Sequence, residues 1–128
     1  MSAYDVGVIG IGTDIVELVR FRETLERTPR IKTRIFTDAE REYADLRHDP
    51  TERYAARWAA KEAVMKAMGV GLGEVAMIDI EIVRADNGAP SVLLHRSALA
   101  RSNEIGIVDW KITLTHTATI AQAIAVAL

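Results

Sequence analysis

One helix-forming stretch, residues 57–73 (RWAAKEAVMKAMGVGLG), constrains the fold of this chain more than any other part of the sequence. At ~100° per residue, one face of this helix carries only small or branched apolar side chains, which allow close packing on a sheet. These residues are Ala56, Ala60, Ala63, Val64 and Ala67. Lys66 lies in the last turn and Gly69 follows the last apolar residue, which is a common C-terminal signal. We therefore expect a long helix that covers a sheet and ends in a glycine loop.

The start of this helix is also marked. Asp49 is a favoured N-cap residue, Pro50 suits the first helical position, and Glu52 stands three residues after Asp49, as in a capping box. The face opposite the alanines carries the large side chains of Tyr54, Trp58 and Met65. A helix that is apolar on two faces is usually buried on both. We therefore expect a second layer, or another subunit, on this face.

Glu62 lies beside that second apolar face, so it is expected to be a partly buried carboxylate. Such a group needs a cation or hydrogen-bond donors to stay charged. Two interpretations are open. Glu62 forms an i,i+4 pair with Lys66, worth roughly a few tenths of a kcal/mol, or it belongs to a site. The glycines at positions 69, 71 and 73 offer free backbone N–H groups just beyond Lys66 and favour the second interpretation.

The composition describes an ordinary globular protein. The 128 residues (14.1 kDa), 49% of them hydrophobic and 27% charged, are expected to form one domain over residues 1–128. No apolar run approaches the ~20 residues of a membrane span, and residues 1–5 lack the features of a signal peptide. The absence of cysteine excludes disulfides and thiolate metal sites and favours a cytoplasmic location.

The charge is unevenly distributed along the chain. A net charge of −2 argues against nucleic-acid binding. Residues 20–34, however, hold six basic residues against two acidic ones, which makes this segment +4 and the remainder −6. The basic residues are Arg20, Arg22, Arg27, Arg30, Lys32 and Arg34. This segment is either a solvated helix face or a docking surface for an acidic partner.

The first half of the chain predicts a strand followed by helices. Residues 6–13 alternate apolar residues with glycines, which indicates a buried strand that other backbone approaches closely. Asp14 follows, where a helical pattern begins at Ile15 and ends near Pro29. Asp14 is either an N-cap or a metal ligand presented at a strand end. A capping box at residues 37–40 opens a short helix that runs to about Leu46.

The second half is mostly extended. Ile78, Ile80 and Ile82 point to one side of a half-buried strand, with Asp79 and Glu81 on the other. A tight turn at residues 86–88 leads to a return strand at 91–94 and a short helix at 97–103. A further strand ends at His116, and residues 120–128 fit a strand buried on both faces or an alanine-rich helix. The predicted class is α+β, an antiparallel sheet with helices packed mainly on one face.

Four side chains from separate elements form a candidate site: Asp14, Glu62, Lys66 and His116. Two carboxylates suit a hard cation such as Mg²⁺, which often binds substrate phosphate as well. A lysine and a histidine near such an ion suit phosphate oxygens. Together these residues suggest phosphoryl-type transfer on a magnesium-bound diphosphate.

Three segments resemble the signature regions of a known family. GIGTDIVE (residues 10–17), RWAAKEAVMKAMGVGLG (57–73) and ITLTHTATIAQAIAV (112–126) are similar to those of the holo-acyl-carrier-protein synthases. These are the short, trimeric 4′-phosphopantetheinyl transferases. The resemblance implies that fold and a transfer of 4′-phosphopantetheine from coenzyme A to a serine of apo acyl-carrier protein, in fatty acid biosynthesis. The second product is 3′,5′-ADP.

The resemblance also implies roles for individual residues. Asp14 and Glu62 match the metal-binding carboxylates, and Lys66 and His116 match residues at the diphosphate. Arg57 and the glycines Gly69, Gly71 and Gly73 match positions that help to hold the nucleotide. The basic helix that carries Arg20, Arg22 and Arg27 matches the surface for acyl-carrier protein. The family is homotrimeric, with the active site between subunits. Thr117 departs from the family, in which many members have an acid directly after the histidine.

The residues fit this chemistry. The serine hydroxyl needs a base, either Glu62 itself or a metal-bound water that it positions, and the water is preferred because a carboxylate that ligates Mg²⁺ is a weaker base. Lys66 stabilises or protonates the leaving phosphate, and His116 orients the diphosphate. Two other functions stay open. The chain is an inactive trimer that binds carrier protein or nucleotide, or it is another Mg²⁺-dependent enzyme that acts on diphosphates.

Overall fold

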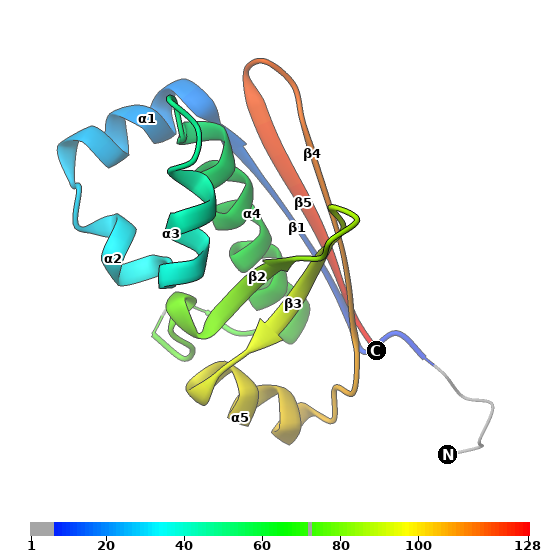
Figure 1. The fold of residues 1–128 in the computed structure, drawn as a ribbon. Helices are drawn as coiled ribbons and strands as arrows, with labels where there is room; N and C mark the ends of the chain where they lie inside the picture. The colour runs from blue at the N-terminus through cyan, green and yellow to red at the C-terminus, as the bar shows by residue number, and fades with distance from the viewer. Residues whose placement is uncertain (1–6, 72) are drawn as a thin grey trace.

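The computed structural model describes residues 7–71 and 73–128, and Figure 1 shows the order of the elements. The predicted strand residue Val6 lies outside the described residues. The elements are β1 (Gly10–Glu17), α1 (Leu18–Arg27), α2 (Ile31–Ile35), α3 (Asp38–Ala44), α4 (Thr51–Met68), the short 3₁₀ helix η1 (Met77–Asp79), β2 (Ile80–Arg84), β3 (Pro90–Leu94), α5 (Arg96–Ile105), β4 (Trp110–His116) and β5 (Ile120–Ala127). They confirm the predicted α+β class. No helix in this part of the chain is long and apolar enough to cross a membrane.

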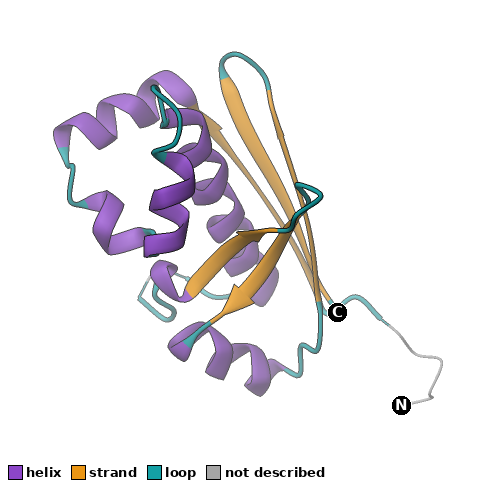
Figure 2. Cartoon of the chain, viewed as in Figure 1, coloured by secondary structure: helices purple, strands orange, loops and turns teal. Residues whose placement is uncertain are grey.

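Within residues 7–71 and 73–128, the strands form two antiparallel sheets instead of the single predicted one. The larger has the order β1-β5-β4, and the smaller pairs β2 with β3, across the predicted turn at residues 86–88. Figure 2 shows the helices on one side of the three long strands, with α4 next to them. The other face of this sheet has no helix on it within the described chain.

The close packing of α4 on β1 depends on two glycines. A Cβ atom on Gly12 would lie 1.9 Å from the carbonyl oxygen of Ala63, and one on Gly10 would lie 1.8 Å from that of Ala67. Strand β5 continues this surface with four buried alanines, Ala121, Ala123, Ala125 and Ala127. The small-residue face of the helix therefore packs on a sheet, as predicted.

Strand β1 is longer at its C-terminal end than the sequence pattern suggested. The predicted helix start at Ile15 is wrong, because β1 stays paired with β5 as far as Glu17, and Asp14 stands opposite Ala123. Backbone pairing over the whole strand outweighs the helical spacing of the apolar residues. Asp14 is consequently a residue within a strand and not an N-cap.

The second apolar face of α4 is covered by the chain itself. Tyr54 is fully buried, and its ring packs edge-on against Phe36, with the centroids 4.9 Å apart. Trp58 makes a similar contact with Phe21 of α1 at 5.7 Å. Of the two covers expected on this face, a second layer or another subunit, the segments α1 to α3 supply the first.

One exposed apolar surface lies on the helix-free face of the three-stranded sheet. Ile11 is 68% exposed, Ile15 58% and Ile124 37%. Residues 11 and 126 face each other across the β1–β5 ladder, as do residues 13 and 124. Burial of β5 on both faces was expected, but within one chain β5 is fully buried only on its alanine face. We call this apolar surface the outer sheet face.

The ends of the helices are mostly as expected. Gly69 adopts the left-handed conformation (φ +70°) after α4, and Thr37 and Glu40 form both bonds of the predicted capping box. At the start of α4, the Asp49 carboxylate accepts hydrogen bonds from the backbone N–H and the hydroxyl of Thr51. The second half of the capping box predicted there is not formed, because Glu52 faces His116 instead.

Two buried polar groups were not expected. Asp79 is 4% exposed and accepts hydrogen bonds from the N–H and hydroxyl of Ser97 at the start of α5, so it does not point to solvent as predicted. Lys61 is fully buried and contacts Glu40 at 2.8 Å. Lys61 also donates to the carbonyl of Ile80, and Glu40 accepts from the N–H of Ile82. This ion pair occupies the edge of β2 where a further strand would otherwise pair.

We expect Gly12→Ala to destabilise the fold by about 3 kcal/mol or more, because the added methyl group meets a backbone carbonyl that cannot move alone. Urea unfolding gives the measurement. Gly7→Ala is the matched control, since nothing lies within 4 Å of its added Cβ. Equal midpoints for both variants would contradict the packing described here.

Candidate active site

Two of the predicted ligands meet between β1 and α4. Asp14 comes from the middle of β1 and Glu62 from the fourth turn of α4, and both line one pocket. The remaining walls come from β1, α1 and α4: Ile15, Val16, Glu17, Arg20, Phe21, Thr24 and Trp58. We call this the carboxylate pocket. The glycines of β1 place the two acids side by side, because they let α4 lie directly on the strand.

The electrostatics of the pocket favour a bound cation. Burial raises the pKa of Glu62, the negative charge of Asp14 raises it further, and Lys66 opposes both effects. The charged form of Glu62 is therefore disfavoured in the protein alone. A cation between the two carboxylates would relieve this cost.

Lys66 lies at the rim of the same site, although not with the predicted partner. Its ammonium group donates to the carbonyl of Thr13 at 2.9 Å and lies 3.4 Å from the Asp14 carboxylate. The alternative of a Glu62–Lys66 pair is wrong, because Lys66 turns toward the adjacent strand. Its side chain is 54% exposed, so it can reach a ligand in front of the pocket.

His116 lies in a different pocket from the two carboxylates. It is the last residue of β4, and its Nε2 atom is 3.4 Å from an oxygen of Glu52, in the first turn of α4. Glu52 precedes Glu62 by ten residues, which corresponds to about 15 Å along a helix. A single chain therefore does not bring all four predicted residues together.

The pocket around His116 is strongly basic. Its lining residues are Tyr43, Arg47, Glu52, Arg53, Ala56, Arg57, Arg84, Gly88, Pro90, Leu114 and His116. We call it the arginine pocket. Three of its guanidinium groups surround the Tyr43 ring, at 4.0, 4.4 and 5.2 Å from the centroid for Arg53, Arg57 and Arg84.

Arg57, which was predicted to hold nucleotide, is the most buried of these arginines. It is 6% exposed, and its Nε atom has no hydrogen-bond partner within the described chain. Desolvation lowers the pKa of Arg57, Tyr43 and Glu40 oppose this effect, and the smaller effects of Arg53 and Arg84 add to it. Like charges gathered in this way, with one orphaned donor, suit a bound anion such as phosphate.

The glycine loop lies at the other end of α4. Gly69 is 17 residues from Glu52, about 25 Å along the helix axis. The N–H of Gly69 donates to the carbonyl of Lys66, and that of Gly71 donates to the Glu74 side chain. The expectation of free N–H groups is therefore wrong for these two glycines, because Gly69 closes the end of the helix and Gly71 binds the Glu74 side chain in the loop. Within one chain the loop does not adjoin the arginine pocket.

The arginines of the basic segment, residues 20–34, differ in the groups that they contact. Arg20 lines the carboxylate pocket, whereas Arg22 forms a 2.7 Å ion pair with Asp49. Hydrogen bonds from Thr51, followed by the Arg22 contact, lower the pKa of Asp49 to about 2. Arg27 stands in the last turn of α1. Arg22 is thus engaged within the chain, and Arg20 is the predicted docking residue that adjoins the site.

Several residues of the two pockets were missed from the sequence. Arg53 precedes Arg57 by one helical turn, so helix geometry could have indicated it. Arg84 and Trp58 carry no comparable signal, because their place in a pocket depends on the tertiary fold. The structure also gives Thr117 a role: its hydroxyl accepts from the N–H groups of Thr119 and Ile120 and closes the β4–β5 turn.

Residues 10–122 match the family described as the 4′-phosphopantetheinyl transferase superfamily. The chain belongs to this superfamily. It is 45% identical to holo-[acyl-carrier-protein] synthase of Moorella thermoacetica over 89% of each chain, and 39% identical to that of Natranaerobius thermophilus over 93% of this chain and 96% of the relative. The predicted family is thereby confirmed.

Solved structures agree with this assignment. Holo-[acyl-carrier-protein] synthase from Neisseria meningitidis superposes with a TM-score of 0.87 at 30% identity, covering 95% of this chain and 99% of that one. The enzyme from Helicobacter pylori, solved in complex with coenzyme A, gives 0.82 at 28% identity, over 92% and 99%.

The raised pKa of Glu62 predicts a pH effect on stability. Above the ordinary carboxyl value of 4.5 and up to its raised folded value, the folded protein binds more protons at Glu62 than the unfolded chain does. Rising pH through this window therefore removes stability. We expect metal-free Glu62→Gln to be as stable as the wild type below this window and more stable above it, in urea unfolding with a chelator. A variant that instead becomes less stable than the wild type as pH rises would contradict this.

Proposed function

We propose that this chain is a holo-[acyl-carrier-protein] synthase. It transfers 4′-phosphopantetheine from coenzyme A to a serine of apo acyl-carrier protein and releases 3′,5′-ADP. The observation that carries the proposal is the Asp14–Glu62 pair beside Lys66, in a chain of this superfamily. Relatives with this name, and the coenzyme A complex of the Helicobacter pylori enzyme, support it. The physiological setting that we propose is fatty acid biosynthesis in the cytoplasm.

Mg²⁺ fits the carboxylate pocket. Among the described residues, no group of three or more acidic, histidine or cysteine side chains could hold a metal. Magnesium needs fewer, because it commonly binds through one or two carboxylates and substrate phosphates and keeps several waters. Asp14 and Glu62 would be its ligands, and their mutual repulsion is the physical reason for a cation there. When bound, it would neutralise charge that develops on the diphosphate oxygens.

Glu62 and Lys66 have separate roles in the transfer reaction. The serine oxygen forms a bond to the phosphorus that bears pantetheine, and the bond from this phosphorus to the departing 3′,5′-ADP oxygen breaks. The serine proton goes to a water that Glu62 orients, or to Glu62 itself; the water is preferred, because a carboxylate that would also hold Mg²⁺ is a weaker base. Lys66 leaves the Thr13 carbonyl and binds the departing phosphate.

The nucleotide occupies the arginine pocket. Phosphate oxygens would satisfy the orphaned Nε of Arg57 and reduce the repulsion between the arginines around Tyr43. His116 would contact the diphosphate from the same pocket.

A homotrimer would bring a carboxylate pocket and an arginine pocket together. They lie about 15 Å apart along α4, so we propose that the carboxylate pocket of one subunit meets the arginine pocket of the next. The outer sheet face supplies the contact, since the side chains of Ile11, Ile15 and Ile124 are exposed there. An apolar surface of this kind on a sheet typically marks an interface.

The transfer itself is tested by mass spectrometry. Wild-type protein with coenzyme A, Mg²⁺ and apo acyl-carrier protein should add the mass of phosphopantetheine to the carrier. Glu62→Gln should lower the rate at least about 100-fold, because it removes a metal ligand and the carboxylate that orients the water. No mass gain with wild-type protein would refute the function. Release of 3′,5′-ADP without a modified carrier would indicate a diphosphate hydrolase.

Acyl-carrier protein would dock beside Arg20, at the rim of the carboxylate pocket. We expect Arg20→Glu to raise KM for the carrier roughly tenfold at low salt, and less at high salt, while KM for coenzyme A stays unchanged. Arg101→Glu on α5 is the control, since that arginine pairs with Glu104 away from both pockets. An equal rise in KM for coenzyme A would show that the docking assignment is wrong.

A further inference from the structure

We propose that Glu52 is a positioning residue for His116: its carboxylate holds the imidazole ring and its tautomer in the arginine pocket. The inference rests on the proposed function, because it assigns His116 to the diphosphate of coenzyme A. Its geometric basis is the 3.4 Å contact between His116 Nε2 and a Glu52 carboxylate oxygen.

Both partners are held by well-defined backbone. Glu52 lies in the first turn of α4, immediately after Thr51, which the Asp49 carboxylate fixes through two hydrogen bonds. His116 ends β4, and the following Thr117 hydroxyl closes the turn to β5. Because neither backbone end is free, the contact can determine the direction of an imidazole whose side chain is 56% exposed.

Glu52 contacts His116 although arginines surround it, and this bears on the role of its carboxylate. Within the described chain, it is the one carboxylate that lines the arginine pocket, which also holds four arginines. Its ion pair within 4.0 Å is nevertheless with His116 and not with any of these guanidinium groups. A carboxylate present only to neutralise the arginines would be expected to contact one of them.

The contact has a chemical consequence for the ring. The 3.4 Å contact is an electrostatic contact and not a hydrogen bond, and the negative carboxylate favours a hydrogen over a lone pair on the facing Nε2 atom. Nδ1 is then the nitrogen left for substrate, and in the protonated ring its N–H can donate to a phosphate oxygen. Without Glu52 the ring can rotate and exchange tautomers, which lowers the fraction of His116 that is ready to bind the diphosphate.

Glu52 also has an opposite effect on the ligand. Its negative charge repels phosphate in the pocket, so its removal offsets the binding that is lost with a misdirected His116: coenzyme A binding should not weaken, whereas the chemical step should slow. A role in stabilising α4 alone would not produce such a split. We therefore compare Glu52→Ala with Glu52→Gln, whose amide oxygen can still accept from Nε2.

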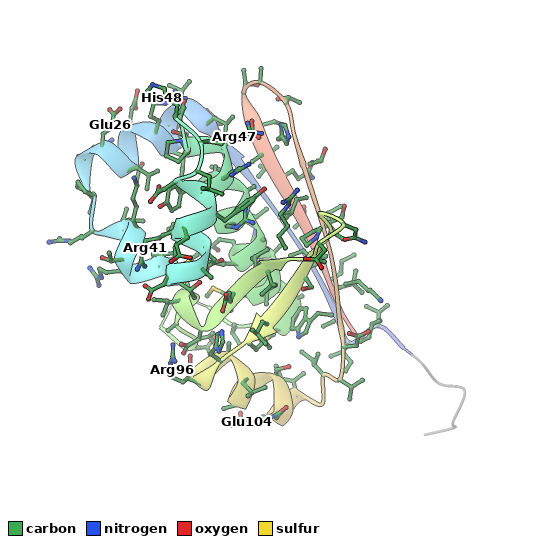
Figure 3. All side chains as sticks on the ribbon, in the orientation of Figure 1. Glu26, Arg41, Arg47, His48, Arg96 and Glu104 are labelled. Carbon is green, nitrogen blue, oxygen red and sulfur yellow. The ribbon has the colours of Figure 1, made fainter. Side chains whose placement is uncertain are left out.

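The experiment measures kcat and KM for coenzyme A, together with the imidazole ¹⁵N chemical shifts of His116, assigned with His116→Ala. In Glu52→Ala we expect kcat to fall about tenfold, KM for coenzyme A to stay equal or fall, and the His116 shifts to move toward a mixture of tautomers. Glu52→Gln should restore most of kcat and the wild-type tautomer. Glu104→Ala is the control, on α5 at the end of the molecule away from Arg47, as Figure 3 shows.

Two results would overturn the inference. One is an unchanged kcat and unchanged His116 shifts in Glu52→Ala. The other is a rise in KM together with a lower unfolding midpoint and an unaltered tautomer, which would restrict Glu52 to the start of α4. A wild-type protein that transfers nothing would refute the proposed function instead, and the ¹⁵N shifts would still decide the role of Glu52.

Discussion

The rest of this structure depends on the direct contact of α4 with β1. Gly10 and Gly12 remove the side chains that would separate the strand from the carbonyls of Ala63 and Ala67. The four buried alanines of β5 extend the same surface. This contact lets a helical residue, Glu62, share a pocket with a strand residue, Asp14. The close packing of α4 on β1 is therefore also what forms the candidate metal site.

The helix also sets the distance between the two pockets. Glu52 stands at its start beside the arginine pocket, and Glu62 and Lys66 follow about three and four turns later beside the carboxylate pocket. Since a rigid helix cannot shorten, one chain alone does not bring His116 to the carboxylates. The exposed isoleucines of the outer sheet face suggest the solution that we propose, in which neighbouring subunits complete each site.

Local patterns predicted the parts of the fold that depend on local energetics. The end of α4 at Gly69, the capping box at Thr37 and the strand that ends at His116 all follow from short-range spacing. The helix start predicted at Ile15 was wrong. The apolar residues from Ile15 onward have helical spacing, but residues 15–17 belong to a strand that pairs with β5. The apolar second face of α4 was recognised, but sequence could not tell a neighbouring subunit from the chain's own Phe36 and Phe21.

The site was predictable to a similar degree. Asp14, Glu62 and Lys66 were chosen for their chemistry and do converge, whereas the position of His116 depends on strand order. The buried Lys61–Glu40 pair was not foreseen, because both residues look like ordinary surface charges in the sequence. Long-range contacts of this kind follow from how the layers meet, which no local spacing encodes.

The shared site is tested most directly by mixing two inactive variants. Glu62→Gln keeps an intact arginine pocket, and His116→Ala keeps an intact carboxylate pocket. The two are unfolded together, refolded and assayed for transfer. If each site takes one pocket from each of two subunits, the mixture should recover roughly a quarter of wild-type activity, because random assembly pairs two intact pockets at that frequency. A mixture of folded trimers that stays as inactive as either variant alone would contradict the shared site.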